Sequence, residues 1–253
     1  MKQGLLYTRP RPVAKSWHAD WSVDTAGSFD FARDLSAAPL AAVEFAIAGR
    51  DHPIVFVEGD GGVTPLALLG LTEKENLSVD AQGQWTGGYI PAFVRRYPFV
   101  LAKDAEKDTY TLCIDEASPA CNTEGKGQPL FDGEGSPSAY LNRQLSLSRE
   151  WERVRAATQA FCERLADLDL LTKQRVSVTD NAGQTSLAGG FSAVDRDRLR
   201  GLSDETLGEL MRAGQLEPIM AHLFSLHGLE GLGRKLDSKR QSAALQSGRQ
   251  AAH

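Results

Sequence analysis

Cysteine is scarce in this sequence, and the cysteines that occur follow no recognisable pattern. The sequence contains three cysteines, which are Cys113, Cys121 and Cys162. Their odd number and their spacing match neither a disulfide framework nor the paired ligands of a zinc site. Such sparse use of cysteine is typical of proteins kept in a reducing compartment. We therefore expect a cytoplasmic protein.

Long apolar runs and an excess of positive charge are also missing. No run approaches the ~18 apolar residues of a membrane-spanning helix, and residues 1–12 hold no apolar stretch long enough for a signal peptide. The 28 Lys and Arg residues are outnumbered by 33 Asp and Glu residues. Because phosphate binding requires clustered cations, we expect no nucleic acid partner. The missing apolar run leads us to expect no membrane-spanning segment.

What remains is the composition of a folded globular protein, with 42% hydrophobic and 24% charged residues. No internal repeat or long linker divides the 253 residues. We predict a single α+β domain over residues 1–236, strand-rich from 1 to 137 and helix-rich from 138 to 236. Residues 237–253 are polar and are expected to form a flexible tail.

The strand-rich part shows short β-branched and aromatic runs separated by turn residues. The run Ile54–Val57 is followed by a glycine-rich turn and by a second apolar run that ends at Leu69, which predicts a hairpin. Further short strands are expected within residues 89–101 and 110–114, with Pro91 and Pro98 at strand ends or bends because proline lacks an amide donor. The sheet is therefore expected to be mainly antiparallel.

The helix-rich part begins where the periodicity of apolar residues changes. Trp151, Phe161 and Leu165 belong to an apolar stripe that predicts a helix between residues 138 and 171. Ser203 is expected to cap a second helix, which Gly214 ends and which turns Leu207, Leu210 and Met211 inward. We expect these helices to pack on the sheet.

Several short motifs in a fixed order resemble the SapC-like family between Phe29 and Leu232. The resemblance implies at most a role near surface-layer or outer-membrane uptake systems, and it names no catalytic residue. The motifs that carry it are Pro39-Leu40 with Glu44-Phe45, His52 to Phe56, Leu68 to Leu71 with Asn76-Leu77, Gly83 to Trp85, Tyr89 to Ala92 with Arg95 to Phe99, Cys113 to Glu116, Pro129 to Phe131, and Gly189 to Phe191 with Val194-Asp195.

One segment combines paired cations with aromatic residues and is our first candidate for a ligand site. Arg95 or Arg96 could grip a carboxylate through bidentate hydrogen bonds, while Trp85, Tyr89 or Tyr97 supplies a flat apolar wall. The ligand would be a peptide, an acidic small molecule or a partner protein.

The alternative for this segment is a structural role. Arg95 and Arg96 would then pair with Asp115 and Glu116 on a neighbouring strand while the aromatic rings pack the core. Substitution of either arginine separates the two interpretations, because one predicts lost binding and the other lost stability.

A second hypothesis comes from His18 and Asp20. Their His-x-Asp spacing occurs in nonheme iron oxygenases, where two histidines and a carboxylate bind one face of the iron. This alternative requires iron and a distant second histidine, for which His52, His222 and His227 are available.

No other catalytic pattern is present. The chain has no Gly-x-Ser-x-Gly elbow and no complete dinucleotide fingerprint after the first predicted hairpin strand. Our leading hypothesis is therefore a nonenzymatic accessory or binding protein that needs no cofactor. The iron oxygenase and a purely structural subunit remain as alternatives, and the sequence does not indicate an oligomeric state.

Overall fold

Three antiparallel sheets form the β part of the fold, as a computed structural model describes it for residues 6–24, 26–59, 61–104, 109–179 and 185–250. The largest sheet has the strand order β10-β11-β4-β5-β3, and the two three-stranded sheets have the orders β1-β7-β6 and β8-β2-β9. The strands are β1 (Pro10–Pro12), β2 (Ser22–Val23), β3 (Ala37–Pro39), β4 (Ile54–Gly59), β5 (Gly62–Leu68), β6 (Phe99–Asp104), β7 (Thr109–Asp115), β8 (Cys121–Asn122), β9 (Gln128–Pro129), β10 (Leu171–Thr179) and β11 (Thr185–Val194).

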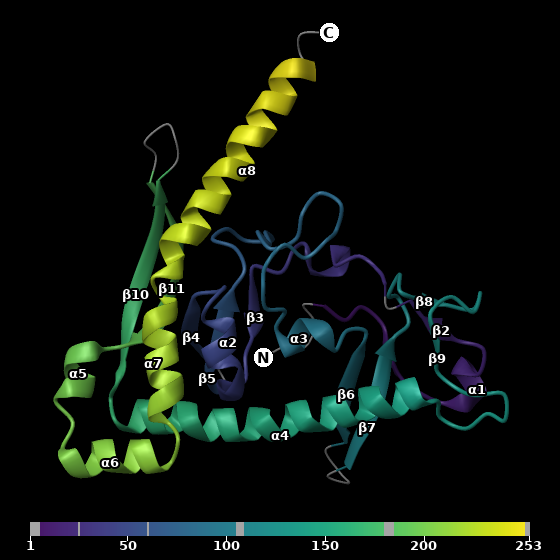
Figure 1. Ribbon diagram of the computed structural model, residues 1–253, viewed down its shortest axis with the longest axis horizontal. Coiled ribbons are helices and arrows are strands. Elements are labelled where there is room, and N and C mark those ends of the chain that lie inside the picture. Colours follow the sequence, from purple (N-terminus) through teal and green to yellow (C-terminus); the bar gives the residue numbers. More distant parts are fainter. Residues whose placement is uncertain (1–5, 25, 60, 105–108, 180–184, 251–253) are drawn as a thin grey trace.

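Most of the long helices follow the strand-rich part, so the predicted α+β class is confirmed (Figure 1). The α-helices are α1 (Lys15–His18), α2 (Phe45–Ala48), α3 (Ala92–Arg95), α4 (Ala139–Asp167), α5 (Arg196–Arg200), α6 (Asp204–Arg212), α7 (Leu216–Ser225) and α8 (Gly228–Gln250). Two short 3-10 helices, η2 (Asp30–Ala32) and η3 (Ala42–Glu44), precede β3 and α2.

The predicted hairpin is strands β4 and β5, which pair from Ile54 opposite Ala67 to Gly59 opposite Gly62. Gly62 has a φ of 91°, a left-handed conformation that glycine adopts without steric cost, and this explains the glycines at the turn. Ile54 and Phe56 point to one face of the sheet and are fully buried against helices α2, α4 and α7. This face forms the main core.

Helix α4 connects the five-stranded sheet with the sheet that contains β6. It begins at the cap residue Ser138, whose hydroxyl accepts a hydrogen bond from the Leu141 amide, and it packs against both β5 and β6. Its predicted apolar stripe is confirmed, because Trp151, Phe161 and Leu165 are all buried. Figure 1 shows this helix lying beneath both sheets.

The segment before β6 differs from the prediction. Residues 89–91 form a connection and residues 92–95 form helix α3, so only the part from Phe99 onward is a strand. Pro91 lies immediately before the first turn of α3, where its missing amide hydrogen costs nothing, and its carbonyl accepts hydrogen bonds from Val94 and Arg95. The expected strand over residues 89–98 is therefore wrong.

The C-terminal helices confirm the capping pattern but not every predicted orientation. The Ser203 hydroxyl accepts a hydrogen bond from the Thr206 amide, and Gly214 follows α6 with a φ of 67°. Leu210 is buried as expected, whereas Met211 is 67% exposed and does not face inward. The prediction for Met211 is wrong because it lies one position beyond the buried stripe of α6.

Helix α8 continues through residues 237–250, for which the sequence predicted a flexible tail, and extends beyond the sheets in Figure 1. Leu232 and Leu236 anchor its first half by packing with Leu71. The boundary between a domain and a tail stays a prediction. No helix among the described residues is long and apolar enough to cross a lipid bilayer.

Candidate functional site

The predicted ligand site lies on the connection from Tyr89 through α3 to β6. Arg95, the last residue of α3, has an exposed guanidinium group. Its Nε donates a hydrogen bond to the Ile90 carbonyl at 3.0 Å, and its Nη2 donates to the Tyr89 hydroxyl at 3.2 Å. The guanidinium carbon lies 5.6 Å from the centre of the Tyr89 ring. These contacts hold the cation in one orientation at the surface.

A buried carboxylate fixes Tyr89 in turn. The Tyr89 hydroxyl donates to Oε1 of Glu44 at 2.7 Å, and the Ala92 amide donates to the same oxygen at 2.8 Å. The other oxygen of Glu44 accepts a hydrogen bond from the Ala41 amide at 2.9 Å. Burial, followed by the hydrogen bond to Glu44, raises the pKa of Tyr89 to about 12. The phenol therefore stays protonated near neutral pH.

Arg96 points into the protein and not toward Arg95. It is 3% exposed, and its guanidinium carbon lies 5.0 Å from the Phe93 ring centre and 5.1 Å from the Trp151 ring centre. Its Nη1 is 4.0 Å from Oε1 of Glu152, at the limit of an ion pair. Nε and Nη1 make no hydrogen bond within the described part of the chain. Arg96 is thus a buried cation enclosed by aromatic rings.

The predicted structural partners of the arginines are not the ones observed. Glu116 forms ion pairs with Arg9 at 3.1 Å and with Arg11 at 3.2 Å. Asp115 is fully buried and accepts hydrogen bonds from the amides of Thr8 and Arg9. Pairing of Arg95 and Arg96 with Asp115 and Glu116 is therefore wrong, because residues 8–11 of the N-terminal segment contact both carboxylates.

Two of the three predicted aromatic residues, Trp85 and Tyr97, belong to a row of half-buried rings. Tyr97 stacks on Phe31 with ring centres 4.2 Å apart, and Trp85 lies 5.6 Å from Phe29. The rings of Phe29 and Phe31 are themselves 6.0 Å apart and connect the two pairs. We call Trp85, Phe29, Phe31 and Tyr97 the aromatic row. Neither phenylalanine was predicted from the sequence, although the two stand only two positions apart at η2.

Tyr89 lies next to this row through His52. The His52 ring donates from Nε2 to the Tyr89 carbonyl at 2.8 Å, and its centre is 6.1 Å from that of Trp85. Burial lowers the pKa of His52, which favours the neutral imidazole. Arg95, Tyr89, His52 and Trp85 thus follow one another along connected contacts, whereas Arg96 belongs to the interior.

The residues of the iron hypothesis do not come together. His18 is fully buried, with its Nε2 3.4 Å from Glu116 and its Nδ1 3.2 Å from the Ala14 carbonyl, whereas Asp20 is exposed. Within the residues that the structure describes, no three His, Cys, Asp or Glu side chains form a group that could hold a metal ion. The arrangement of these residues therefore does not support an iron site at His18 and Asp20.

The thiols offer little nucleophilic chemistry. Burial raises the pKa of both Cys121 and Cys162 to about 12, and it raises that of Cys113 as well. Because the thiolate is the reactive form of cysteine, these groups are poor nucleophiles near neutral pH.

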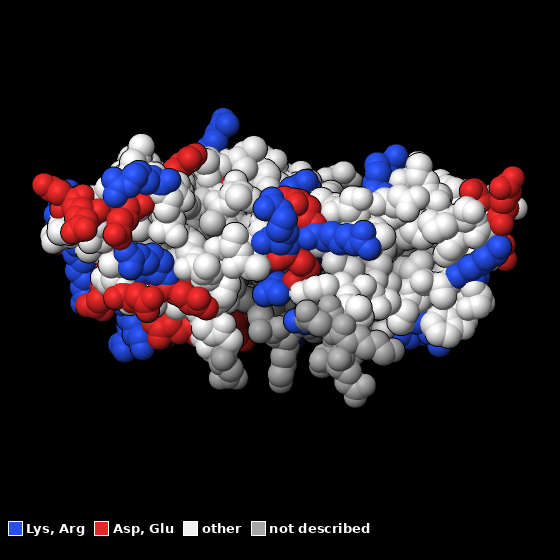
Figure 2. Space-filling model, turned by 90° about the horizontal axis from the view of Figure 1, so that it is seen from below, with Lys and Arg blue, Asp and Glu red and all other residues white. Residues whose placement is uncertain are grey.

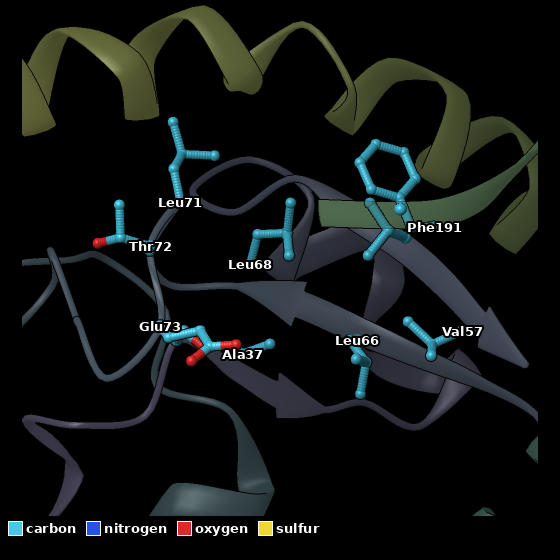
Figure 3. A pocket seen from close by; sticks show the side chains of 12 residues that line it. Ala37, Val57, Leu66, Leu68, Leu71, Thr72, Glu73 and Phe191 are labelled. Carbon is cyan, nitrogen blue, oxygen red and sulfur yellow. The ribbon is translucent and has the colours of Figure 1, made fainter. Parts of the chain in front are cut away.

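A hollow of about 160 Å³ lies on the opposite face of the five-stranded sheet from the main core (Figure 3). Val57, Leu66, Leu68, Leu71 and Phe191 supply its apolar lining. None of the five residues predicted for the ligand site lines this hollow. The two features are separate.

Charge is mixed on the face that Figure 2 shows, below the molecule as drawn in Figure 1. Along α4 two exposed arginines pair with glutamates three residues earlier, Arg153 with Glu150 and Arg155 with Glu152, the latter at 2.8 Å. Such alternation produces no broad field of one sign on this face.

Comparison with known proteins gives one family and no individual relative. The model of the SapC family matches residues 13–232, which is most of the chain. No curated protein and no solved structure matches. The match includes every residue of the predicted ligand site and the aromatic row.

Proposed function

The chain belongs to the SapC family, and we propose that it is a binding protein that recognises a carboxylate of a peptide, an acidic small molecule or a partner protein at Arg95. The observation that carries this proposal is the state of the Arg95 guanidinium. It is exposed, it is held by two hydrogen bonds, and it forms no ion pair within the described residues.

The donors that remain on Arg95 suit a carboxylate. A guanidinium group has about five N–H donors, and the contacts with Ile90 and Tyr89 use two of them. The remaining donors include those on Nη1, so a carboxylate could accept two parallel hydrogen bonds. Because Tyr89 and Glu44 already fix the side chain, little rotational freedom would be lost on binding.

The aromatic row would supply the apolar part of the same site. Trp85 follows Tyr89 through His52, and each ring of the row is only half-buried. A ligand with an apolar group beside its carboxylate could cover part of these rings while Arg95 holds the acid. Arg96 would then lie beneath the site, among the core rings, and not touch the ligand.

The family resemblance suggests the cellular systems in which this binding protein would act. It points to surface-layer or outer-membrane uptake systems, in which the protein would act as an accessory component. We propose a cytoplasmic location on the basis of the sparse cysteines, two of which are buried.

Titration followed by NMR tests the site, with acetyl-Gly-Phe as the probe. The free acid should shift the Arg95 Nε–H resonance, and the C-terminal amide of the same dipeptide should not. Arg95→Ala should weaken binding of the free acid at least about tenfold, the cost of one charge-assisted contact. Arg212 on α6 is also exposed, so Arg212→Ala is the matched control and should bind as the wild type does. Equal binding of the acid and the amide would refute the proposal.

A structural subunit is the second candidate, and exposed apolar side chains favour it. Val43 is 72% exposed, Ile47 is 48% exposed and Phe224 is 61% exposed. They lie on η3, α2 and α7, and the latter two helices pack against each other. Large exposed apolar groups on neighbouring elements are typical of protein interfaces.

Ile47→Asp would distinguish this role from ligand binding. If α2 and α7 form an interface, the variant should elute from cell extract at the size of the free chain, while the wild type elutes as a larger assembly. Equal elution of the two proteins as free chains would exclude the structural role.

A further inference from the structure

Strand β10 forms one edge of the five-stranded sheet. It pairs antiparallel with β11 from Leu171 to Thr179, with one register shift between Val176 and Ser177, and no described strand pairs with its other side. An edge strand presents the N–H and C=O groups of alternate residues to any chain that approaches it. The edge is nine residues long, enough for a short peptide to add as another strand.

A hollow of about 430 Å³ lies next to this edge. Phe191 and Ala193 of β11 form its floor, and Leu223, Leu226 and Leu229 at the junction of α7 and α8 form its wall. Thr172 and Gln174 of β10 line the side nearest the edge. Because alternate residues of a strand point to the same face, every second side chain of an added strand would point toward this apolar hollow.

Two cations that line the hollow have no ion pair within the described residues. They are Arg175 on the edge strand and Arg196 at the start of α5, and both are exposed. Arg196 donates one hydrogen bond to the Leu223 carbonyl at 3.1 Å. Asp195 also lines the hollow, but the cation that its carboxylate contacts is Arg198, at 3.9 Å, and its other oxygen accepts hydrogen bonds from the amides of Asp197 and Arg198.

The charge of the edge also selects among possible occupants. Lys173 and Arg175 lie on the same short stretch of β10, and Lys173 has only a 3.7 Å contact with the exposed Glu58. In an antiparallel pair of two β10 strands, cations of one copy would meet cations of the other, and such cross-strand pairs are destabilising. An acidic strand would meet the opposite charge.

We propose that an acidic peptide adds to the free edge of β10 as an extended strand, places an apolar side chain in the hollow between β11 and the α7–α8 junction, and sets carboxylates beside Arg175 and Arg196. Main-chain hydrogen bonds to β10 give this site its affinity, and the hollow and the cations give it preference for alternating acidic and apolar residues. The site is separate from Arg95.

The probe is the capped peptide acetyl-Glu-Val-Glu-Leu-Glu-Val-Glu-amide, labelled for fluorescence anisotropy. It should bind the full-length protein and protect the β10 amides from hydrogen exchange. Replacing every glutamate with lysine should abolish binding, and N-methylation of alternate peptide bonds should weaken it at least about tenfold, since it removes the ladder donors. Failure of the glutamate peptide to bind at millimolar concentration, or protection elsewhere than in β10, would overturn the proposal.

Charge reversal locates the site on the protein. Arg175→Glu should weaken binding about tenfold, whereas Arg149→Glu, an equal change at an exposed position on α4, should leave binding unchanged. Equal effects of the two variants would show a general charge effect and would contradict a site at β10. Arg95→Ala leaves this peptide bound if the two sites are independent, so either site can fail without the other.

Discussion

His222 bridges two strands at the point where their pairing stops, and this contact makes the stability of the fold sensitive to acid. Strands β4 and β11 pair at Phe56 opposite Ser192. Beyond that point, the His222 ring from α7 accepts a hydrogen bond from the Val194 amide through Nε2 at 3.0 Å. It donates another from Nδ1 to the Ile54 carbonyl at 2.9 Å.

The imidazole can make both hydrogen bonds only in its neutral form. A proton on Nε2 would remove the acceptor for Val194 and place a positive charge at a fully buried position. The pKa of His222 falls from 6.5 to about 4, mainly because of burial; the hydrogen bond to the Ile54 carbonyl opposes this shift, and the positive charge of Arg196 adds to it. In the unfolded chain, the ring regains its ordinary pKa.

The sign of the pH dependence follows from this difference. Because the folded pKa lies below the unfolded one, the unfolded chain binds the proton first, and the free energy of unfolding falls as the pH decreases from about 6.5 toward about 4. Each pH unit in this window costs about 1.4 kcal/mol, so the loss between about pH 7 and pH 5 is about 2 kcal/mol. The full loss at lower pH reaches about 3 kcal/mol.

Urea unfolding followed by circular dichroism at several pH values measures this loss. His222→Gln keeps a donor and an acceptor but cannot titrate. Its free energy of unfolding should be lower than that of the wild type at neutral pH, and it should not show the decrease of about 2 kcal/mol between about pH 7 and pH 5. His227→Gln, at an exposed position just after α7, is the matched control and should keep the decrease. His52→Gln is the second comparison, since burial lowers the pKa of His52 too. Parallel curves for the wild type and His222→Gln would refute the reasoning.

Three further substitutions have definite expected outcomes. Arg96→Ala should lower the free energy of unfolding, measured in urea, by about 3 kcal/mol, because it removes a buried cation from between two rings. The same variant should leave ligand binding at Arg95 unchanged. Ser203→Ala should lower it by about 1 kcal/mol through loss of the α6 cap, and a smaller change would show that the helix does not need the cap. Gly70→Ala should reduce the melting temperature strongly, because a Cβ there would lie 2.0 Å from the Glu75 carbonyl oxygen, and an unchanged value would contradict this packing.

Local patterns in the sequence were sufficient to predict those features of the fold that depend on residues close together in the chain. The turn after Ile54–Val57 needs only the glycines that follow it, and the cap at Ser203 needs only the amide of Thr206. The stripe on α4 was visible because one helix carries all of its members. Each of these features depends on neighbours within a few residues.

Contacts between distant segments determined the features that the sequence did not show. Arg96 is buried because Trp151, on α4, lies beside it. Leu232 and Leu236 hold the first half of α8 through Leu71 of the loop after β5. The aromatic row joins Trp85 to Phe29 and Phe31 across more than fifty residues. No periodicity within one segment reports which other segment will pack on it.

The divergence of Arg95 and Arg96 limits what this site can bind. Adjacent side chains point to opposite faces of a strand and lie ~100° apart on a helix, so neither structure would have aimed both guanidinium groups at one carboxylate. A hydrogen bond to a charged group contributes about 3 kcal/mol at most, and a dissociation constant of 1 mM corresponds to about 4 kcal/mol. Arg95 alone therefore cannot hold a small acid tightly. A ligand of useful affinity must also cover the aromatic row, which favours a peptide or a partner protein over a simple acid.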